Sequence, residues 1–184
     1  MSDNLEGLVR AKESDVESEK KPLEAINYLA TSNSNSFYTD QTSRYFETSI
    51  YAQKIYAIDL NQDGYVDLVT LDEVYSTPKF YLFSSKKQKF IQYKKNVFNK
   101  TVFGSFLNFV DLNKDGVIDV FVGTLNQNTA FDKNKLRLFL GAKNKNEVHF
   151  IEQELPIGTL KDSPNSSIVL IDFNLDGELD IYFA

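Results

Sequence analysis

Three nine-residue segments of the chain place carboxylate and amide side chains at one fixed spacing. Each reads Asp-x-Asn-x-Asp-Gly-x-x-Asp, and the copies span residues 59–67, 111–119 and 172–180. The side-chain oxygens at positions 1, 3, 5 and 9 can converge on one point if the glycine at position 6 takes a left-handed turn, which bulkier residues resist. Four hard oxygen donors with three negative charges, and no His or Cys among them, suit a calcium ion.

The predicted ligands of each ion are these four side chains and the main-chain carbonyl of position 7, by analogy with other oxygen-rich loops. They are Asp59, Asn61, Asp63, Tyr65 and Asp67 in the first loop, Asp111, Asn113, Asp115, Val117 and Asp119 in the second, and Asp172, Asn174, Asp176, Glu178 and Asp180 in the third. Up to three structural calcium ions are therefore expected. A turn without an ion is the alternative for any single copy. Without metal the carboxylates repel one another, so the loops should loosen.

An EF-hand begins with the same six residues but requires a bidentate Glu at position 12 and a helix on each side. Position 12 is Thr70, Val122 and Phe183 in the three copies. The flanking segments are apolar and rich in β-branched and aromatic residues, which predicts strands. Dockerin-like loop pairs fail for the same reason and because their loops lie closer together. The sequence therefore excludes both helical classes of calcium loop.

The predicted strands fall into a repeating unit of strand, loop, strand, strand, turn and strand. Strands are expected before the loops at 51–58, 103–110 and 167–171, and after them at 66–71, 118–123 and 179–183. Two more strands follow each of the first two loops, at 79–83 and 90–93 and at 135–140 and 148–153. The first aspartates of successive loops are 52 and 61 residues apart, since they stand at 59, 111 and 172. A four-stranded unit that recurs at about 50 residues is typical of a propeller blade.

The fold class is therefore predicted to be all-β, a partial β-propeller of four-stranded blades with calcium-binding loops between the first two strands of each blade. We expect a flexible polar lead-in over residues 1–34 and the propeller segment over residues 35–184, with repeats around 51–95, 103–154 and 167–184. A further strand is expected at 37–42, as the last strand of a preceding blade. Further blades or partner chains are expected to close the ring, because the third repeat holds only its first two strands.

Composition limits the classes of function. No nucleic-acid partner is expected, but the distribution of charge matters more than the net charge of −6. Ten of the 26 acidic residues lie inside the three loops, and the rest of residues 35–184 is basic, since that range holds 16 Lys and Arg and only 9 Asp and Glu outside the loops. Cysteine is absent, which excludes disulfides and thiol chemistry. No apolar run reaches the length of a membrane span, and the N-terminus lacks the pattern of a secretion signal. An extracellular, periplasmic or secretory-pathway location with a removed leader is expected, because such loops more often need millimolar calcium.

The segment 171–182, an apolar strand followed by Asp172-Phe173-Asn174-Leu175-Asp176-Gly177-Glu178-Leu179-Asp180 and a second strand, resembles the FG-GAP/VCBS repeats of integrin-alpha-like β-propellers. The resemblance covers residues 37–184, and residues 136–174 also resemble the T-cell immunomodulatory protein group of that superfamily. It implies a seven-bladed extracellular or periplasmic propeller, structural calcium on these loops, and a role in adhesion or protein recognition. The chain departs from the Phe-Gly…Gly-Ala-Pro signature, of which only Phe103-Gly104 remains.

The predicted function is a calcium-stabilised binding or adhesion module that presents blade surfaces to a protein or glycan partner. A structural subunit of a larger assembly is the first alternative, and a propeller-based enzyme or enzyme-accessory domain is the second. An enzyme is not expected, because the chain has one histidine, no cysteine, no nucleophile-elbow pattern and no phosphate loop. Six lysines are expected on a solvated outer strand, with a basic face for acidic glycans or lipid headgroups as the alternative: Lys86, Lys87, Lys89, Lys94, Lys95 and Lys100.

Overall fold

The structure is a computed structural model that describes residues 30–31, 39–124, 136–142, 147–155 and 167–183. Its elements alternate strands with short connections, and one four-residue helix is the exception. In chain order they are β1 (Ala30–Thr31), β2 (Thr39–Asp40), α1 (Thr42–Tyr45), β3 (Lys54–Ile58), β4 (Asp67–Leu71), β5 (Lys79–Ser84), β6 (Lys89–Gln92), β7 (Phe106–Val110), β8 (Asp119–Gly123), β9 (Arg137–Gly141), β10 (Phe150–Gln153), β11 (Ile168–Ile171) and β12 (Asp180–Phe183).

Two four-stranded antiparallel sheets form the body of the structure. The first blade has the order β3-β4-β5-β6 and the second has the order β7-β8-β9-β10, so each strand pairs with its neighbour in the chain. The predicted all-β fold of propeller-type blades is confirmed. The pairings join equivalent positions in both blades, for example Ile58 with Asp67 and Val110 with Asp119. Each nine-residue loop therefore begins directly after the last paired residue of the first strand, and its ninth residue is the first paired residue of the second strand.

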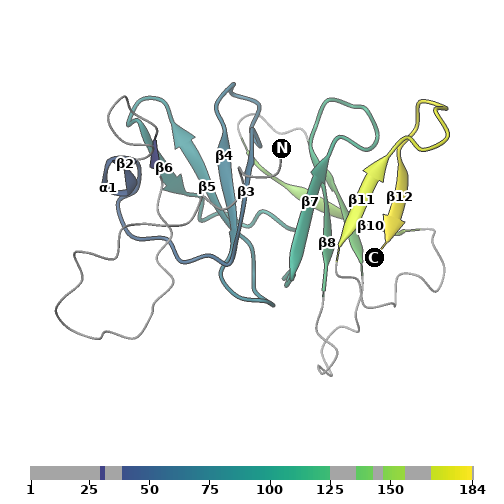
Figure 1. The fold of residues 1–184 in the computed structure, drawn as a ribbon, viewed down its shortest axis with the longest axis horizontal. Coiled ribbons are helices and arrows are strands. Elements are labelled where there is room, and N and C mark those ends of the chain that lie inside the picture. The colour runs from purple at the N-terminus through teal and green to yellow at the C-terminus, as the bar shows by residue number, and fades with distance from the viewer. Residues whose placement is uncertain (1–29, 32–38, 125–135, 143–146, 156–166, 184) are drawn as a thin grey trace, which may run out of the picture.

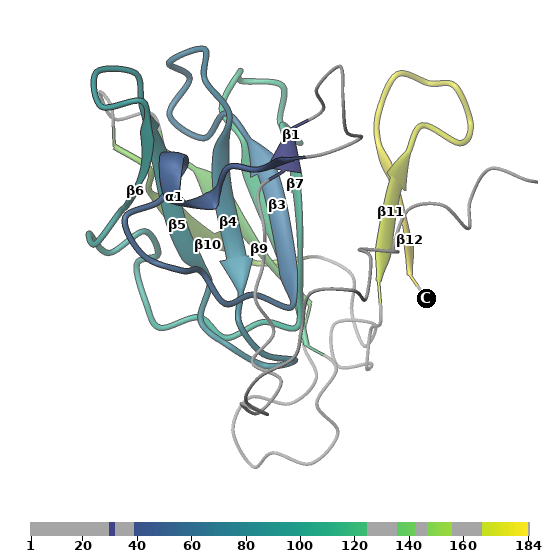
Figure 2. The same cartoon turned by 60° about the vertical axis from the view of Figure 1, so that its left-hand side comes forward.

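The hairpin β11–β12 repeats the first half of a blade. Ile171 pairs with Asp180, which is the same register as in the first two blades. Figure 1 shows the first blade, the second blade and this hairpin side by side, with the three β-hairpin loops along the upper edge. Figure 2 shows the hairpin standing at one end of the row. The repeat thus brings the three loops to one rim of the fold.

Alternating side chains of the second blade pack against both of its neighbours. Val120 and Val122 lie in one buried cluster with Val69 and Leu71 of the first blade. Phe121, between them in sequence, lies in a second buried cluster that includes Ile168 of the hairpin. Successive residues of a strand point to opposite faces, so β8 supplies the core on both sides. All three of its central residues are fully buried.

The predicted strands before and after each loop are confirmed, with ends that differ by a few residues. The strand expected at 37–42 ends earlier in the structure, since β2 ends at Asp40 and α1 begins at Thr42, and residues 37–38 lie outside the described residues. The Asp40 carboxylate accepts a hydrogen bond from the Thr42 N–H at 2.8 Å, which favours a turn over a continued strand. Most of the expected lead-in, at 1–29 and 32–34, lies outside the described residues.

The buried cluster between the first two blades predicts a large loss of stability when one of its aromatic rings is removed. Phe139 is fully buried and its ring centroid lies 4.8 Å from that of Phe98. We expect Phe139→Ala to lower the free energy of unfolding by about 3–5 kcal/mol in a urea titration, because it removes the packing and leaves a cavity. Phe173→Ala is the matched control, since Phe173 is 84% exposed and should change stability by less than about 0.5 kcal/mol. Equal losses for the two variants would contradict this packing.

Candidate metal centre

The three loops share one hydrogen-bond pattern, which begins at the aspartate of position 1. In the second loop the Asp111 carboxylate accepts the N–H of Asp115 at 3.1 Å and the N–H of Gly116 at 2.9 Å. Asp59 and Asp172 accept the equivalent pairs of N–H groups at 2.9–3.1 Å. The hydrogen bonds from positions 5 and 6 to the carboxylate of position 1 therefore bend each loop back toward its first residue.

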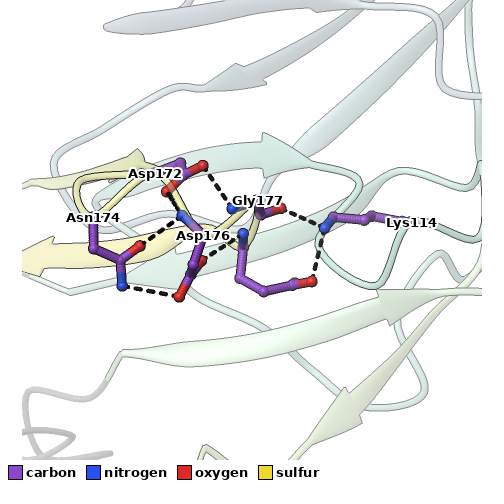
Figure 3. Close-up of polar contacts among 6 residues, drawn as sticks. Lys114, Asp172, Asn174, Asp176 and Gly177 are labelled. Carbon is purple, nitrogen blue, oxygen red and sulfur yellow. Dashed lines mark hydrogen bonds and ion pairs between the residues drawn. The ribbon is translucent and has the colours of Figure 1, made fainter.

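Positions 3 and 5 complete the loop interior. Asn113 Oδ1 accepts the Asp115 N–H at 3.1 Å, and Asn113 Nδ2 donates to Asp115 Oδ2 at 2.9 Å. The remaining oxygen, Asp115 Oδ1, accepts the Val117 N–H at 2.7 Å. The same contacts recur in the first loop and in the third, where Figure 3 shows Asp172, Asn174 and Asp176 gathered around one turn. Three of the predicted ligand side chains thus converge in every loop.

Left-handed backbone at two positions allows this tight turn. The glycine at position 6 has φ of 87°, 83° and 89° in the three loops. Only glycine adopts this conformation without a steric cost from a side chain. Position 4 is also left-handed, at Gln62, Lys114 and Leu175, with φ of 58°, 58° and 60°. Bulky residues rarely take this conformation, so the contacts of the loop must hold it in place.

The aspartate of position 9 points into the protein rather than toward solvent. Asp119 is fully buried, and its two carboxylate oxygens accept the Leu112 N–H at 2.9 Å and the Gly141 N–H at 2.8 Å. Asp67 makes the same pair of bonds, with the N–H groups of Leu60 and Phe83. One oxygen therefore holds position 2 of the loop and the other holds the third strand of the blade.

Asp180 makes only the first of these two bonds in the described hairpin. Its Oδ2 accepts the Phe173 N–H at 3.0 Å. The second partner in the other two blades lies on the third strand, and β11–β12 is a two-stranded sheet in this structure. The third loop therefore has the same turn as the others but a weaker connection to the sheet.

Electrostatics favour a cation at these loops. Burial raises the pKa of Asp67 to about 6, opposed by the N–H groups of Phe83 and Leu60 and assisted by the nearby charges of Asp63 and Asp59. Burial also raises the pKa of Asp119, opposed by the N–H groups of Gly141 and Leu112. A bound divalent ion would offset the repulsion among these carboxylates.

The structure thus brings the predicted residues together in part. The side chains of positions 1, 3 and 5 converge, and the main-chain N–H of position 7 donates a hydrogen bond to the carboxylate of position 5. The carboxylate of position 9 lies beneath the turn and bonds to main-chain N–H groups instead. In the part of the chain that the structure describes, no three His, Cys, Asp or Glu side chains gather into a group that could hold a metal ion. The donors of each loop nonetheless fit calcium in kind, because carboxylate and amide oxygens make up the whole set.

Sequence reasoning missed the residues at position 4. Gln62 Nε2 donates a hydrogen bond to the Gly116 carbonyl of the second loop. Lys114 Nζ donates to the Gly177 carbonyl of the third loop at 2.5 Å and pairs with Glu178 Oε1 at 2.9 Å, as Figure 3 shows. The only signal in the sequence was a long hydrogen-bond donor at position 4 of the first two loops. The bonded residues are 54 and 63 positions apart, so spacing alone could not pair them.

The blades and loops define a β-propeller-like module. The family model for the FG-GAP-like repeat matches residues 59–122 and 111–183, which together cover more than half of the chain. The chain therefore belongs to the FG-GAP-like repeat family, and the broader resemblance to integrin-alpha-like propellers agrees with this. Both matched segments begin at the first aspartate of a loop and end in the second strand of the next hairpin. No curated protein matches the chain.

The position-9 contacts predict different costs for one substitution at two equivalent sites. Asp119→Asn keeps one acceptor oxygen but turns an N–H group toward a backbone N–H, so we expect a loss of about 2–3 kcal/mol in the free energy of unfolding. Asp180→Asn is the matched control and should cost less, because Asp180 makes one such bond and is partly exposed. Chemical denaturation in the presence of a chelator measures both without any contribution from bound metal. Equal costs would contradict the role assigned to Asp119.

Proposed function

We propose that this chain is a calcium-stabilised β-propeller segment that presents its blade surfaces to a protein or glycan partner. The observation that carries the proposal is the threefold recurrence of one loop geometry, in which oxygen-bearing side chains at positions 1, 3 and 5 converge on a single turn. Three copies of such a turn on one rim need a common explanation. Calcium supplies it, since the ion would bind oxygen donors and offset their mutual repulsion.

Calcium in this role is structural. The Asp115 carboxylate of position 5 accepts the Val117 N–H within the turn, and at the end of the same loop the Asp119 carboxylate accepts the Gly141 N–H of the third strand. An ion bound to positions 1, 3 and 5 would fix the turn directly above the buried carboxylate of position 9. Asp63 and Asp67 stand in the same relation in the first loop. Loss of the ion would therefore loosen both the loop and the strand pairing that depends on it.

The basic groove beside the first blade favours a partner that is recognised by shape and hydrogen bonds over a polyanion. The groove has a volume of about 590 Å³, and four lysines lie among its lining residues. Three of them already pair with carboxylates: Lys79 with Asp72, Lys95 with Glu147, and Lys100 with Glu152. Paired lysines attract a polyanion less than free ones do, which supports a protein or a weakly charged glycan.

The open face of the β11–β12 hairpin supports a further blade as its neighbour. Val69 of β4 and Phe121 of β8 are both fully buried by the next unit in the row. Tyr182 holds the equivalent position two residues after the position-9 aspartate, yet it is 68% exposed. Val169, Ile171 and Phe173 are exposed on the same hairpin and, with Tyr182, line an apolar hollow. This face also favours the second candidate function, a structural subunit of a larger assembly.

The proposed setting is extracellular, periplasmic or within the secretory pathway, where calcium concentrations match the needs of such loops. None of the helices in the described residues is long and apolar enough to cross a membrane. We propose a binding role without catalysis, because the clustered carboxylates lie in the three loops and their oxygens already accept main-chain N–H groups.

Calcium removal tests the proposal. At calcium concentrations about 100 times the dissociation constant, one site adds about 2.7 kcal/mol to folding, or roughly 5–10 °C in Tm for a chain of this size. We expect calcium to raise Tm by at least this amount over the chelator-treated protein in a calorimetric melt, and magnesium to raise it less. The triple variant Asp63→Asn, Asp115→Asn, Asp176→Asn should lose the response. Identical melts with calcium and with chelator would refute structural calcium.

The open face predicts self-association of the isolated chain. Exposed apolar faces of this kind promote association, so we expect the mass measured by light scattering to rise with protein concentration. Val169→Lys combined with Tyr182→Lys should keep the chain monomeric. Val74→Lys is the control, because Val74 is exposed to a similar degree as Val169 but lies outside the hairpin. A wild-type chain that stays monomeric throughout would argue against a blade-binding face.

A further inference from the structure

The residue at position 4 of one loop bonds to the glycine of the next loop, and this contact occurs twice. Gln62 of the first loop donates to the Gly116 carbonyl of the second, and Lys114 of the second donates to the Gly177 carbonyl of the third at 2.5 Å. Both donors are at position 4 of their loop, and both acceptors are the glycine at position 6 of the following loop. A contact that recurs at equivalent sites in successive repeats is a feature of the repeat rather than an accident of one side chain.

The accepting peptide group is also part of the proposed calcium site. The carbonyl of Gly116 and the N–H of Val117 belong to one planar peptide unit, and this N–H donates to Asp115 Oδ1 at 2.7 Å. The unit between Gly177 and Glu178 does the same for Asp176 Oδ1 at 2.8 Å. A donor from the preceding loop therefore fixes the plane of the peptide that orients the position-5 carboxylate. Hydrogen bonds at the two ends of one peptide also strengthen each other.

We propose that Gln62 and Lys114 are positioning residues that couple each calcium loop to the next one along the rim. The inference rests on the proposed calcium sites. It adds that each site depends on a residue of the preceding loop. Gln62 orients Asp115 through the peptide 116–117, and Lys114 orients Asp176 through the peptide 177–178. An ion in the first or second loop fixes the backbone on both sides of position 4, and this holds the donor in place for the following loop.

Pairing with a carboxylate partly offsets the charge of Lys114 near the third loop. Its Nζ lies 2.9 Å from Glu178 Oε1, a carboxylate at position 7 of the same loop that receives the hydrogen bond. Gln62 provides the same donation without a charge. The shared property of the two residues is therefore the hydrogen bond and not the cation.

The coupling ends at the third loop. Leu175 holds position 4 there with the same left-handed backbone, is 86% exposed, and has an apolar side chain that cannot donate a hydrogen bond. It therefore serves as a natural control within the same chain. Substitution of Leu175 should leave every calcium site unchanged, whereas substitution of Lys114 should weaken the third site and substitution of Gln62 the second.

The test is a calcium titration of the full chain followed by NMR at the Gly64, Gly116 and Gly177 amides, which report one loop each. Lys114→Met keeps the aliphatic stem and removes the donor, and we expect it to weaken calcium binding at Gly177 by roughly threefold, the size of one exposed hydrogen bond. Gln62→Met should do the same at Gly116. Lys114→Gln restores a donor and should retain most of the wild-type affinity, which separates the hydrogen bond from the charge.

The controls are Leu175→Ala, at the equivalent position, and Lys86→Met, which removes an exposed lysine from the β5–β6 turn. A second readout needs no metal: amide exchange of Glu178 should accelerate in Lys114→Met and stay unchanged in both controls. If calcium binds all three loops of Lys114→Met as in the wild type, the coupling is refuted and the calcium sites stand. If the wild type binds no calcium at the three glycines, the proposed function and the coupling both fail.

Discussion

The structure depends on one buried carboxylate in each complete blade. Asp67 and Asp119 close the nine-residue loops and use both oxygens, one to hold the loop at position 2 and one to hold the third strand. A buried charge is tolerated only when hydrogen bonds satisfy it, and here the loop and the third strand provide them together. The loop, the hairpin and the third strand are therefore fixed by the same side chain. This makes the ninth aspartate an organiser of the blade, beneath the turn in which positions 1, 3 and 5 converge.

The loops then link the blades to one another on one rim, while apolar side chains link them through their faces. Phe121 and Val122 are adjacent in sequence but pack toward different neighbours. Gln62 and Lys114 join the loops above them. The two kinds of contact differ in chemistry, since one is buried and apolar and the other is exposed and polar, but both depend on the same placement of the blades. A blade placed correctly by its core therefore also brings each loop within reach of the next.

Much of this arrangement could be predicted from the sequence, and the reason is the repeat. Three copies of the Asp-x-Asn-x-Asp-Gly-x-x-Asp pattern, with strands on each side, identified the loops and the blade unit. The contacts of Asp119 with Gly141 and of Lys114 with Gly177 were not predictable, because they join residues that only the packed blades bring together. The strand expected to run to residue 42 ends at Asp40, since the Asp40 carboxylate accepts the Thr42 N–H at the start of a helical turn. Local patterns thus revealed the repeat, and long-range geometry assigned the roles within it.

The most direct test of structural calcium on this rim is a crystal structure of the full chain grown with calcium, with anomalous scattering used to locate the ions. The account predicts one ion in each loop, bound by the side chains of positions 1, 3 and 5, with the carboxylates of Asp67 and Asp119 still buried beneath the turns. Well-ordered loops without ions at a saturating calcium concentration, or ions bound only at other surfaces, would contradict it.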